Sequence, residues 1–149
     1  MDAIVRLTQE IGKLWRAVRK LQITGFQRPT WLTTPLTSAA WDGDAYSTTA
    51  KTLIDLSAVF SAPANIKAAL FRVGIRDSGS AGSLCYIILA PDATASQGPA
   101  FSIESVPNDI WRYTMMLVPC DANGDVYYEV TASGASALDV VLQIWGYWL

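Results

Sequence analysis

The sequence contains no histidine among its 149 residues, and this absence restricts the chemistry open to it. Without histidine there is no Ser-His-Asp or Cys-His nucleophile and no imidazole to bind a metal. A hydrolase would depend on carboxylates alone, and Asp42 and Asp44 in the stretch WDGDAY form the best-spaced pair. Asp and Gly also form turns, and we favour a turn there. We therefore expect a non-enzymatic protein, with a depolymerase that uses Asp42 and Asp44 as the remote alternative.

The stretch DANGDVYYE resembles a calcium loop in its first five residues. Asp121, Asn123 and Asp125 have the 1-3-5 spacing of such a loop, but the Gly at position 6 and the Glu at position 12 are missing. Asn123-Gly124 between two strand patterns is a strong hairpin signal. The sequence predicts a hairpin and no cofactor, and it leaves a weak calcium site at Asp121 and Asp125 open.

The two cysteines give no sign of reactivity or of a disulfide framework. Cys85 lies in an apolar run, which predicts a small buried side chain. Cys120 follows a proline at a predicted strand end, and neither cysteine has a base close to it in the sequence.

A heptad repeat occupies the first 23 residues. Every a and d position of three heptads is apolar, with β-branched residues at a and Leu at d. These positions are Ile4, Leu7, Ile11, Leu14, Val18 and Leu21. Ala3, Ala17 and Trp15 at flanking positions widen the apolar seam, which favours three strands over two. The pattern predicts a trimeric coiled coil that ends near Gly25 and Pro29, although a single helix packed on the body was also considered.

Charge is distributed unevenly along the chain, whose formal net charge is −2. Residues 1–23 have five basic and two acidic side chains, whereas the remainder has 6 basic and 11 acidic ones. This balance argues against nucleic-acid binding by the whole chain and predicts an acidic body on a basic stem. No signal peptide and no apolar run of membrane-spanning length are visible, so we expect synthesis in a cytoplasm and no membrane insertion.

Alternation of apolar and polar residues dominates the rest of the chain. Seven runs have the length and the period of two that are typical of β-strands, and turn signals separate them. The runs are residues 51–57, 69–75, 83–90, 100–105, 110–117, 125–132 and 138–149. Short strands without intervening helices predict an antiparallel sandwich of seven or eight strands. We expect three parts: a coiled-coil helix at 1–23, a connector at 24–50 and a β-sandwich at 51–149.

Aromatic residues are the remaining clue to function. The chain ends in IWGYWL, and so apolar a terminus must be buried. We predict that Trp145, Tyr147 and Trp148 form a subunit interface around a threefold axis. Aromatics also concentrate on binding surfaces. The candidate surface-binding residues are Trp41, Asp42, Asp44 and Tyr127.

The organisation as a whole resembles the small trimeric fibres and knobs of tailed bacteriophages. The resemblance rests on a short coiled coil, a proline-containing connector and phrases such as PLTSAAWDGDAYS, PCDANGDVYYEV and IWGYWL. It implies a mostly β, jelly-roll-like body in a homotrimeric virion surface protein. The helix would bind other virion proteins, and the knob would bind a host glycan or protein. The alternative is a capsid decoration protein on the outer shell.

Overall fold

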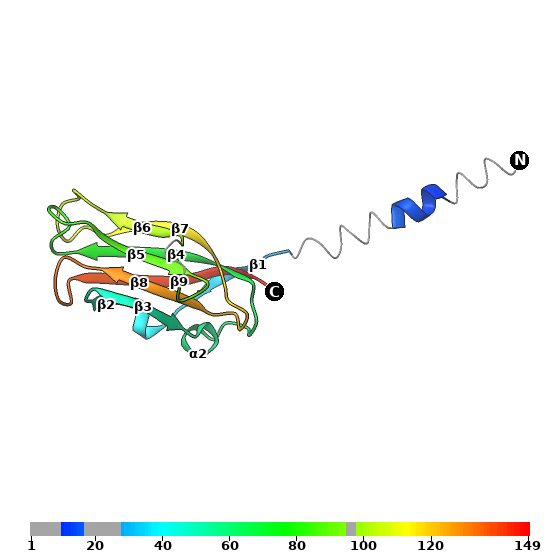
Figure 1. Cartoon of the computed structure of the whole chain (residues 1–149), viewed down its shortest axis with the longest axis horizontal. Helices are drawn as coiled ribbons and strands as arrows, with labels where there is room; N and C mark the ends of the chain where they lie inside the picture. Colours follow the sequence, from blue (N-terminus) through cyan, green and yellow to red (C-terminus); the bar gives the residue numbers. More distant parts are fainter. Residues whose placement is uncertain (1–9, 17–27, 95–97) are drawn as a thin grey trace, which may run out of the picture.

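The computed structural model describes residues 10–16, 28–94 and 98–149. From residue 28 onward the described chain is mostly β, with nine strands arranged as two antiparallel sheets packed face to face (Figure 1). Residues 10–16 are helical. In the described part of the chain, no helix has the length and apolar character needed to cross a membrane.

Sheet A is the larger of the two sheets and contains both the first and the last strand. Its strands run in the order β1-β9-β4-β7, and β2 also pairs with β9, beyond the segment that pairs with β1. Sheet B has the order β3-β8-β5-β6. The strands of sheet A are β1 (Thr30–Leu36), β2 (Asp42–Tyr46), β4 (Ala68–Asp77), β7 (Arg112–Pro119) and β9 (Leu138–Trp148). Those of sheet B are β3 (Thr49–Ile54), β5 (Cys85–Ala90), β6 (Ala100–Ile103) and β8 (Val126–Thr131).

The strand order is that of a jelly-roll-like sandwich. If β1 and β2 count as one interrupted strand, each sheet has four strands, and its neighbours come from distant parts of the sequence. For example, the last strand, β9, lies between the first strand and β4. Such long-range pairing closes two Greek keys on each other. The predicted antiparallel sandwich is therefore confirmed, with nine strands in the described residues where seven or eight were expected.

The core lies between the two sheets and comes mainly from alternate residues of the long central strands. Phe71 and Ile75 of β4 and Leu142 and Ile144 of β9 are fully buried. Less buried residues alternate with them, among them Arg72 and Gln143 but also the apolar Leu70 and Val141. All seven predicted runs contain a strand.

We expected a connector at 24–50 with one or two short extended pieces; two such pieces are present, but they belong to the sandwich, which already begins at Thr30. Strands β1 and β2 lie within that range and pair with β9 as edge strands. A 3-10 helix, η1 (Ala39–Trp41), separates them. Their threonines and aspartates and the single Pro35 obscured the strand pattern, yet such residues are tolerated at sheet edges.

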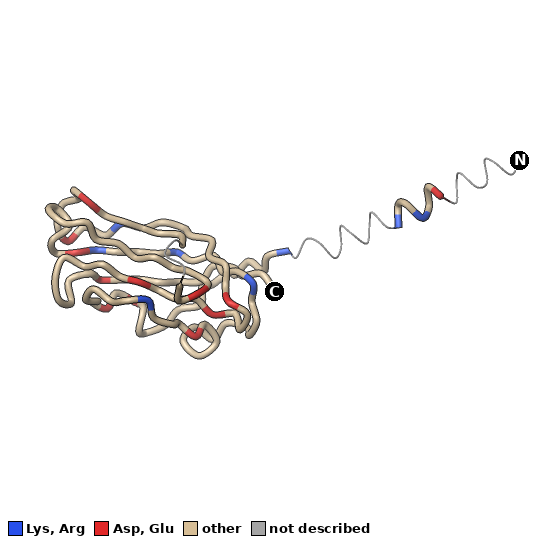
Figure 2. Tube along the Cα trace, viewed as in Figure 1, with Lys and Arg blue, Asp and Glu red and all other residues tan. Residues whose placement is uncertain are grey.

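The two ends of the sandwich differ in what they contain. The terminal end holds the start of β1, the C-terminus and the helix α2 (Leu56–Phe60), whose N-cap is Asp55 (Figure 1). The distal end holds the loops 47–48, 78–84, 104–111 and 132–137. Acidic side chains outnumber basic ones on the sandwich (Figure 2).

Candidate interaction surface

Strand β7 turns its more apolar face to solvent. Tyr113, Met115 and Leu117 are 46%, 50% and 52% exposed, whereas Met116 and Val118 face the core. The register explains this orientation, because Tyr113 lies opposite Gly74 and Leu117 lies opposite Leu70 on the outer face of β4. Alternation in the sequence predicted the strand but not which face is covered. An exposed row of large apolar residues is typical of a surface that contacts another protein.

The terminal half of the outer face of sheet A forms one apolar patch. Leu70 lies opposite Leu117 on one side and Gly146 on the other, and the Trp31 ring lies over Gly146. Trp31 is 63% exposed and makes an edge-to-face contact with Trp148, with 5.8 Å between ring centroids. We call this set the apolar patch: Trp31, Leu70, Met115, Leu117, Trp145 and Trp148.

A bulge in β9 changes which of the terminal aromatics face outward. Ile144 pairs with Phe71 and Gly146 pairs with Leu70, so Trp145 is an extra residue in the ladder. After it the alternation shifts by one, and Tyr147 lies opposite the fully buried Ala69 and packs against the core. Tyr147 is therefore turned toward the chain's own core rather than to the face that carries Asp139 and Gln143, and its role in a subunit interface stays a prediction. Trp148 takes the outward position in its place.

Trp145 has an unusual environment. Its indole nitrogen is shielded from solvent and has no hydrogen-bond partner among the described residues. A buried indole N–H normally donates to an acceptor, so the N–H of Trp145 is an unsatisfied hydrogen-bond donor beside the other residues of the apolar patch.

Trp41 is buried, at 5% exposure, so the prediction that it is a surface-binding residue is wrong. Its ring stacks on Tyr46 with 4.7 Å between centroids and meets Tyr128 edge-on at 4.9 Å. The Tyr46 hydroxyl donates to the carbonyl oxygen of Ala40. Burial raises the pKa of Tyr46, and unfavourable electrostatic interactions with Tyr128 and Asp44 raise it further. The three rings join the edge strand β2 of sheet A to β8 of sheet B.

The other candidate binding residues lie on different sheets. Asp42 and Asp44 are exposed on β2, on either side of Gly43, which faces the Trp111 ring. Tyr127 is half-buried on β8 in sheet B, opposite the exposed Leu53. The two aspartates and Tyr127 therefore do not form a single site, and binding by each remains a prediction.

An aromatic–arginine cluster covers the distal half of the outer face of sheet A. Arg72 and Arg76 alternate along β4 on either side of Gly74, and the Tyr113 ring occupies the space above this glycine. Trp111 and Tyr113 stack nearly parallel, at 5.7 Å between centroids and 17° between planes. The Arg72 guanidinium carbon lies 4.1 Å from the Tyr113 ring centre, and that of Arg76 lies 5.0 Å from the Trp111 ring centre. We define the aromatic–arginine cluster as Arg72, Arg76, Trp111, Tyr113, Asp139 and Gln143.

The sequence also did not predict a hydrogen-bond network at the distal end. Asp77 lies at its centre and is fully buried. Its carboxylate accepts hydrogen bonds from the N–H of Gly79 at 2.6 Å, from the N–H of Ser133 at 3.1 Å and from the Ser133 hydroxyl. The Asp77 carbonyl accepts from the N–H of Asp109. Three loops therefore converge on one residue. The only signal in the sequence was an Asp followed by Ser-Gly, which reads as an ordinary turn.

Ser80 extends this network. Its buried hydroxyl lies within hydrogen-bond distance of the carbonyl oxygens of Asp77, Val106 and Pro107. The fourth distal loop joins through Ser47, whose hydroxyl oxygen accepts from the N–H of Ser136. The distal end is thus a hydrogen-bonded platform rather than a set of independent loops.

The predicted hairpin at Asn123-Gly124 is wrong, because the flanking strands β7 and β8 lie in different sheets and do not pair with each other. The segment is instead a tight turn in the connection between the sheets, where the N–H of Gly124 donates to the carbonyl oxygen of Asp121. The Asp121 carboxylate accepts from the N–H groups of Asn123 and Asp125 at 2.8 and 2.9 Å, and Asp125 accepts from the N–H of Leu56. These carboxylates cap the turn and the helix α2. The described residues contain no group of three or more acidic, cysteine or histidine side chains able to hold a metal.

Both thiols are protonated near neutral pH. Burial, a hydrogen bond to Asp77 and its charge raise the pKa of Cys85 to about 11. Burial and the charges of Asp121 and Asp125 raise the pKa of Cys120 to about 12. Neither cysteine has the lowered pKa of a nucleophilic thiol.

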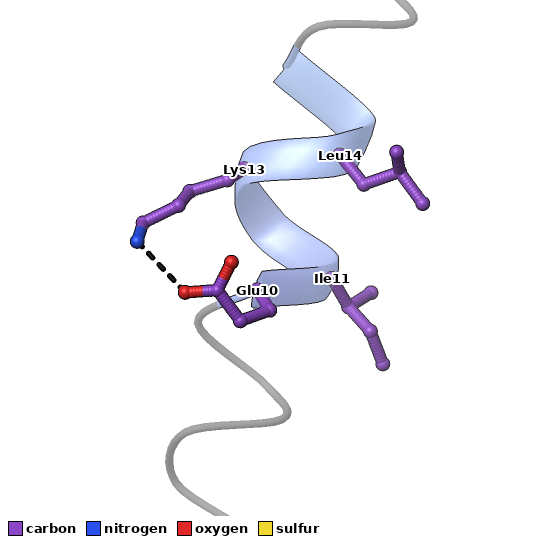
Figure 3. A pocket seen from close by; sticks show the side chains of 4 residues that line it. All are labelled: Glu10, Ile11, Lys13 and Leu14. Carbon is purple, nitrogen blue, oxygen red and sulfur yellow. Dashed lines mark hydrogen bonds and ion pairs between the residues drawn. The ribbon is translucent and has the colours of Figure 1, made fainter.

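The described turns of the heptad segment expose its apolar side. Ile11 and Leu14 are 47% and 65% exposed and lie together on one side of the helix, whereas Lys13 and Glu10 form an ion pair of 2.8 Å on another (Figure 3). A shallow hollow beside these four residues is open surface, because one helix alone cannot enclose a ligand. The predicted interface residues Ile4, Leu7, Val18 and Leu21 lie outside the described residues.

No protein-family model matches the sequence, and no curated protein matches it. Among solved structures, the coat protein of Tobacco streak virus is similar to this chain, with a TM-score of 0.47 and 8% sequence identity. The alignment covers 81% of this chain and 86% of the coat protein chain. The fold assignment rests on the strand order of the two sheets and not on this similarity.

Proposed function

We propose that this chain is a subunit of a non-enzymatic, homotrimeric attachment protein on the surface of a bacteriophage particle. Its N-terminal heptads form the stem and bind other virion proteins, and its β-sandwich forms a head that binds the host surface. The stem-and-head organisation of the sequence supports this proposal, as does its resemblance to phage fibres.

The observation that carries the assembly part is the outward apolar face of β7. In the described chain nothing covers Met115, Leu117 or Trp31, and each is at least half exposed. A soluble protein rarely leaves so many large side chains uncovered on one face. We propose that further copies of this same chain cover these side chains in the assembled protein.

The position of the apolar patch favours copies of the chain over an unrelated partner. Trp31 belongs to β1, and Thr30 follows the last heptad leucine, Leu21, by nine positions. Extended chain spans at most about 3.5 Å per residue, so a coiled coil would hold the terminal ends of its copies within about 30 Å of the bundle. The patch lies at this same end, where neighbouring heads would meet.

The mass of the full chain in solution tests the assembly. We expect light scattering at micromolar concentration to give about three times the 16.2 kDa of one chain. Leu117→Glu places a charge in the patch and should shift dissociation to at least about tenfold higher concentration, because burying an unpaired carboxylate is costly. Leu117 is half exposed in the single chain, so the head itself should still fold.

Ser102→Glu is the matched control, because it adds the same charge at an exposed position of β6 in sheet B. This variant should remain trimeric. A wild-type chain that stays monomeric, or a Ser102→Glu variant that dissociates as readily as Leu117→Glu, would contradict the proposed interface.

Attachment is tested with the phage itself. The purified trimer should compete with particles for the host surface and slow their adsorption, whereas the Leu117→Glu variant should compete less well. If imaging instead locates the protein on the capsid shell, and high salt releases it, the capsid decoration role replaces the fibre role.

A further inference from the structure

Two arginines in equivalent positions of β4 have different partners. Arg76 lies opposite Asp139 and forms an ion pair with it, with Nε 2.8 Å from the carboxylate oxygen. Arg72 lies opposite Gln143 and donates from Nη1 to the neutral Oε1 at 3.1 Å. The salt bridges of the described residues are Glu10–Lys13 and Arg76–Asp139, so Arg72 has no carboxylate partner there.

The uncompensated charge of Arg72 lies at an exposed aromatic surface. Its guanidinium is half-buried and lies over the ring of Tyr113, which is 46% exposed. Trp111 extends this surface by stacking on Tyr113. Gly74 is required beneath the ring, because a Cβ at this position would overlap Tyr113. One cation, two aromatic rings and one amide therefore face solvent together.

We propose that the aromatic–arginine cluster is a binding site for a sugar that carries a carboxylate, an inference that rests on the proposed role in host attachment. The Arg72 guanidinium binds the carboxylate, because its planar pair of N–H donors matches the two oxygens. The solvent-exposed edges of the stacked Tyr113 and Trp111 rings contact the C–H groups of the pyranose, and the Gln143 amide is in reach of a hydroxyl.

The arrangement favours an acidic sugar over a neutral sugar or an acidic peptide. A neutral sugar would leave the charge of Arg72 without a counter-ion in a partly buried position. An acidic peptide would pair with the charge but has no flat, C–H-rich surface for the two stacked rings. Arg76 is already neutralised by Asp139 and holds Trp111 in place.

The test is binding of glucuronic acid to the full-length protein, measured by saturation-transfer NMR and by titration. Its uncharged methyl ester and acetate serve as matched ligands that lack the charge and the ring, respectively. We expect glucuronate to bind at least about tenfold more tightly than either, since a charge-assisted hydrogen bond contributes enough for that ratio. Equal binding of the ester, or equal binding of acetate, would overturn the proposal, and so would no binding at all.

Variants locate the binding to this cluster. Arg72→Gln and Tyr113→Ala should each weaken glucuronate binding about tenfold or more. Arg112→Gln is the control, because Arg112 is exposed and lies opposite the inward-facing Ile75, on the other side of the strand from Tyr113. Loss of binding in Arg112→Gln equal to that in Arg72→Gln would overturn the site.

The two proposals can fail separately. A trimer that blocks adsorption but binds no glucuronate refutes only the acidic-sugar site. A monomer that binds glucuronate through Arg72 and Tyr113 refutes only the assembly.

Discussion

At the distal end of the sandwich four loops share one hydrogen-bonded network, whereas the terminal end exposes apolar side chains from four strands of sheet A. The distal network uses buried polar groups that are satisfied within the chain, with Asp77 and Ser80 at its centre. The terminal end leaves Trp31 and Leu117 uncovered and the indole N–H of Trp145 without a partner. One end satisfies its central buried polar groups within a single chain, and the other leaves a row of large apolar side chains uncovered.

This difference is consistent with a head that assembles through its terminal end and binds ligands nearer its distal end. Loops that bind ligands are usually positioned by a rigid scaffold, and the network around Asp77 provides one. Contiguous exposed apolar patches are uncommon on monomeric proteins and often mark a surface that a partner covers. We infer that assembly uses the terminal end and leaves the distal end and the aromatic–arginine cluster accessible.

The largest expected effect comes from breaking the distal network. Asp77→Ala removes a buried acceptor from two N–H groups and a hydroxyl at a partly buried site, which should cost about 3 kcal/mol of unfolding free energy. Denaturant unfolding of the variant measures this loss. Glu104→Ala, an exposed acidic residue at the same end, should change stability by less than about 0.5 kcal/mol. Equal losses in the two variants would show that Asp77 is an ordinary loop residue.

Sequence patterns predicted the strands well because alternation is a local property. The runs that became β4 and β9 carry strict alternation over nearly their whole length, and each is a central strand of sheet A. By contrast, β1 and β2 pair through irregular registers and contain Pro and Asp residues. Their place in the sheet depends on β9, which lies about a hundred residues away in the sequence.

The candidate site was less predictable, because it depends on which face of each strand is covered. In β7 both faces contain large apolar residues, so the sequence could not show that Met116 and Val118 are inside. One bulge at Trp145 reversed the orientation of Tyr147. The Arg72–Tyr113 contact joins strands β4 and β7, and only the register brings these residues together.

Substituting the two arginines of the cluster should change the free energy of unfolding by smaller and unequal amounts. Arg76→Gln breaks a partly buried ion pair and should cost about 1 kcal/mol of unfolding free energy, near the upper limit for such pairs. Arg72→Gln loses a hydrogen bond to a neutral amide and a contact with the Tyr113 ring but no ion pair, and it should cost less than Arg76→Gln, which also loses a contact with the Trp111 ring. Thermal unfolding of the two variants compares them directly. A larger loss in Arg72→Gln would show that Arg72 stabilises the fold and is not reserved for a ligand.

The smallest expected effect concerns how the stability contributions of Asp77 at the distal end and Asp125 at the terminal end change with pH. The two changes should have opposite signs. Burial disfavours ionisation of Asp77, but the hydrogen bonds from Ser133 and Gly79 outweigh it and hold the pKa of the carboxyl below its ordinary value of 3.8. At the terminal end, burial and the charges of Asp55 and Asp121 outweigh the Leu56 N–H and raise the pKa of Asp125 above that value.

A lowered folded pKa adds stability above pH 3.8, and this stability is lost as the pH falls through the folded value. A raised folded pKa does the reverse, so acidification from neutral pH first relieves the unfavourable charge of Asp125. Denaturant midpoints measured from pH 7 to pH 3 should therefore show Asp125→Asn gaining relative to wild type at pH 7, with the gain fading on acidification. Asp77→Asn should be less stable than wild type at pH 7, with the deficit shrinking below pH 3.8. If both variants changed with pH in the same direction, the electrostatic contrast between the ends would be absent, and the terminal carboxylate would be stabilising in the single chain as well.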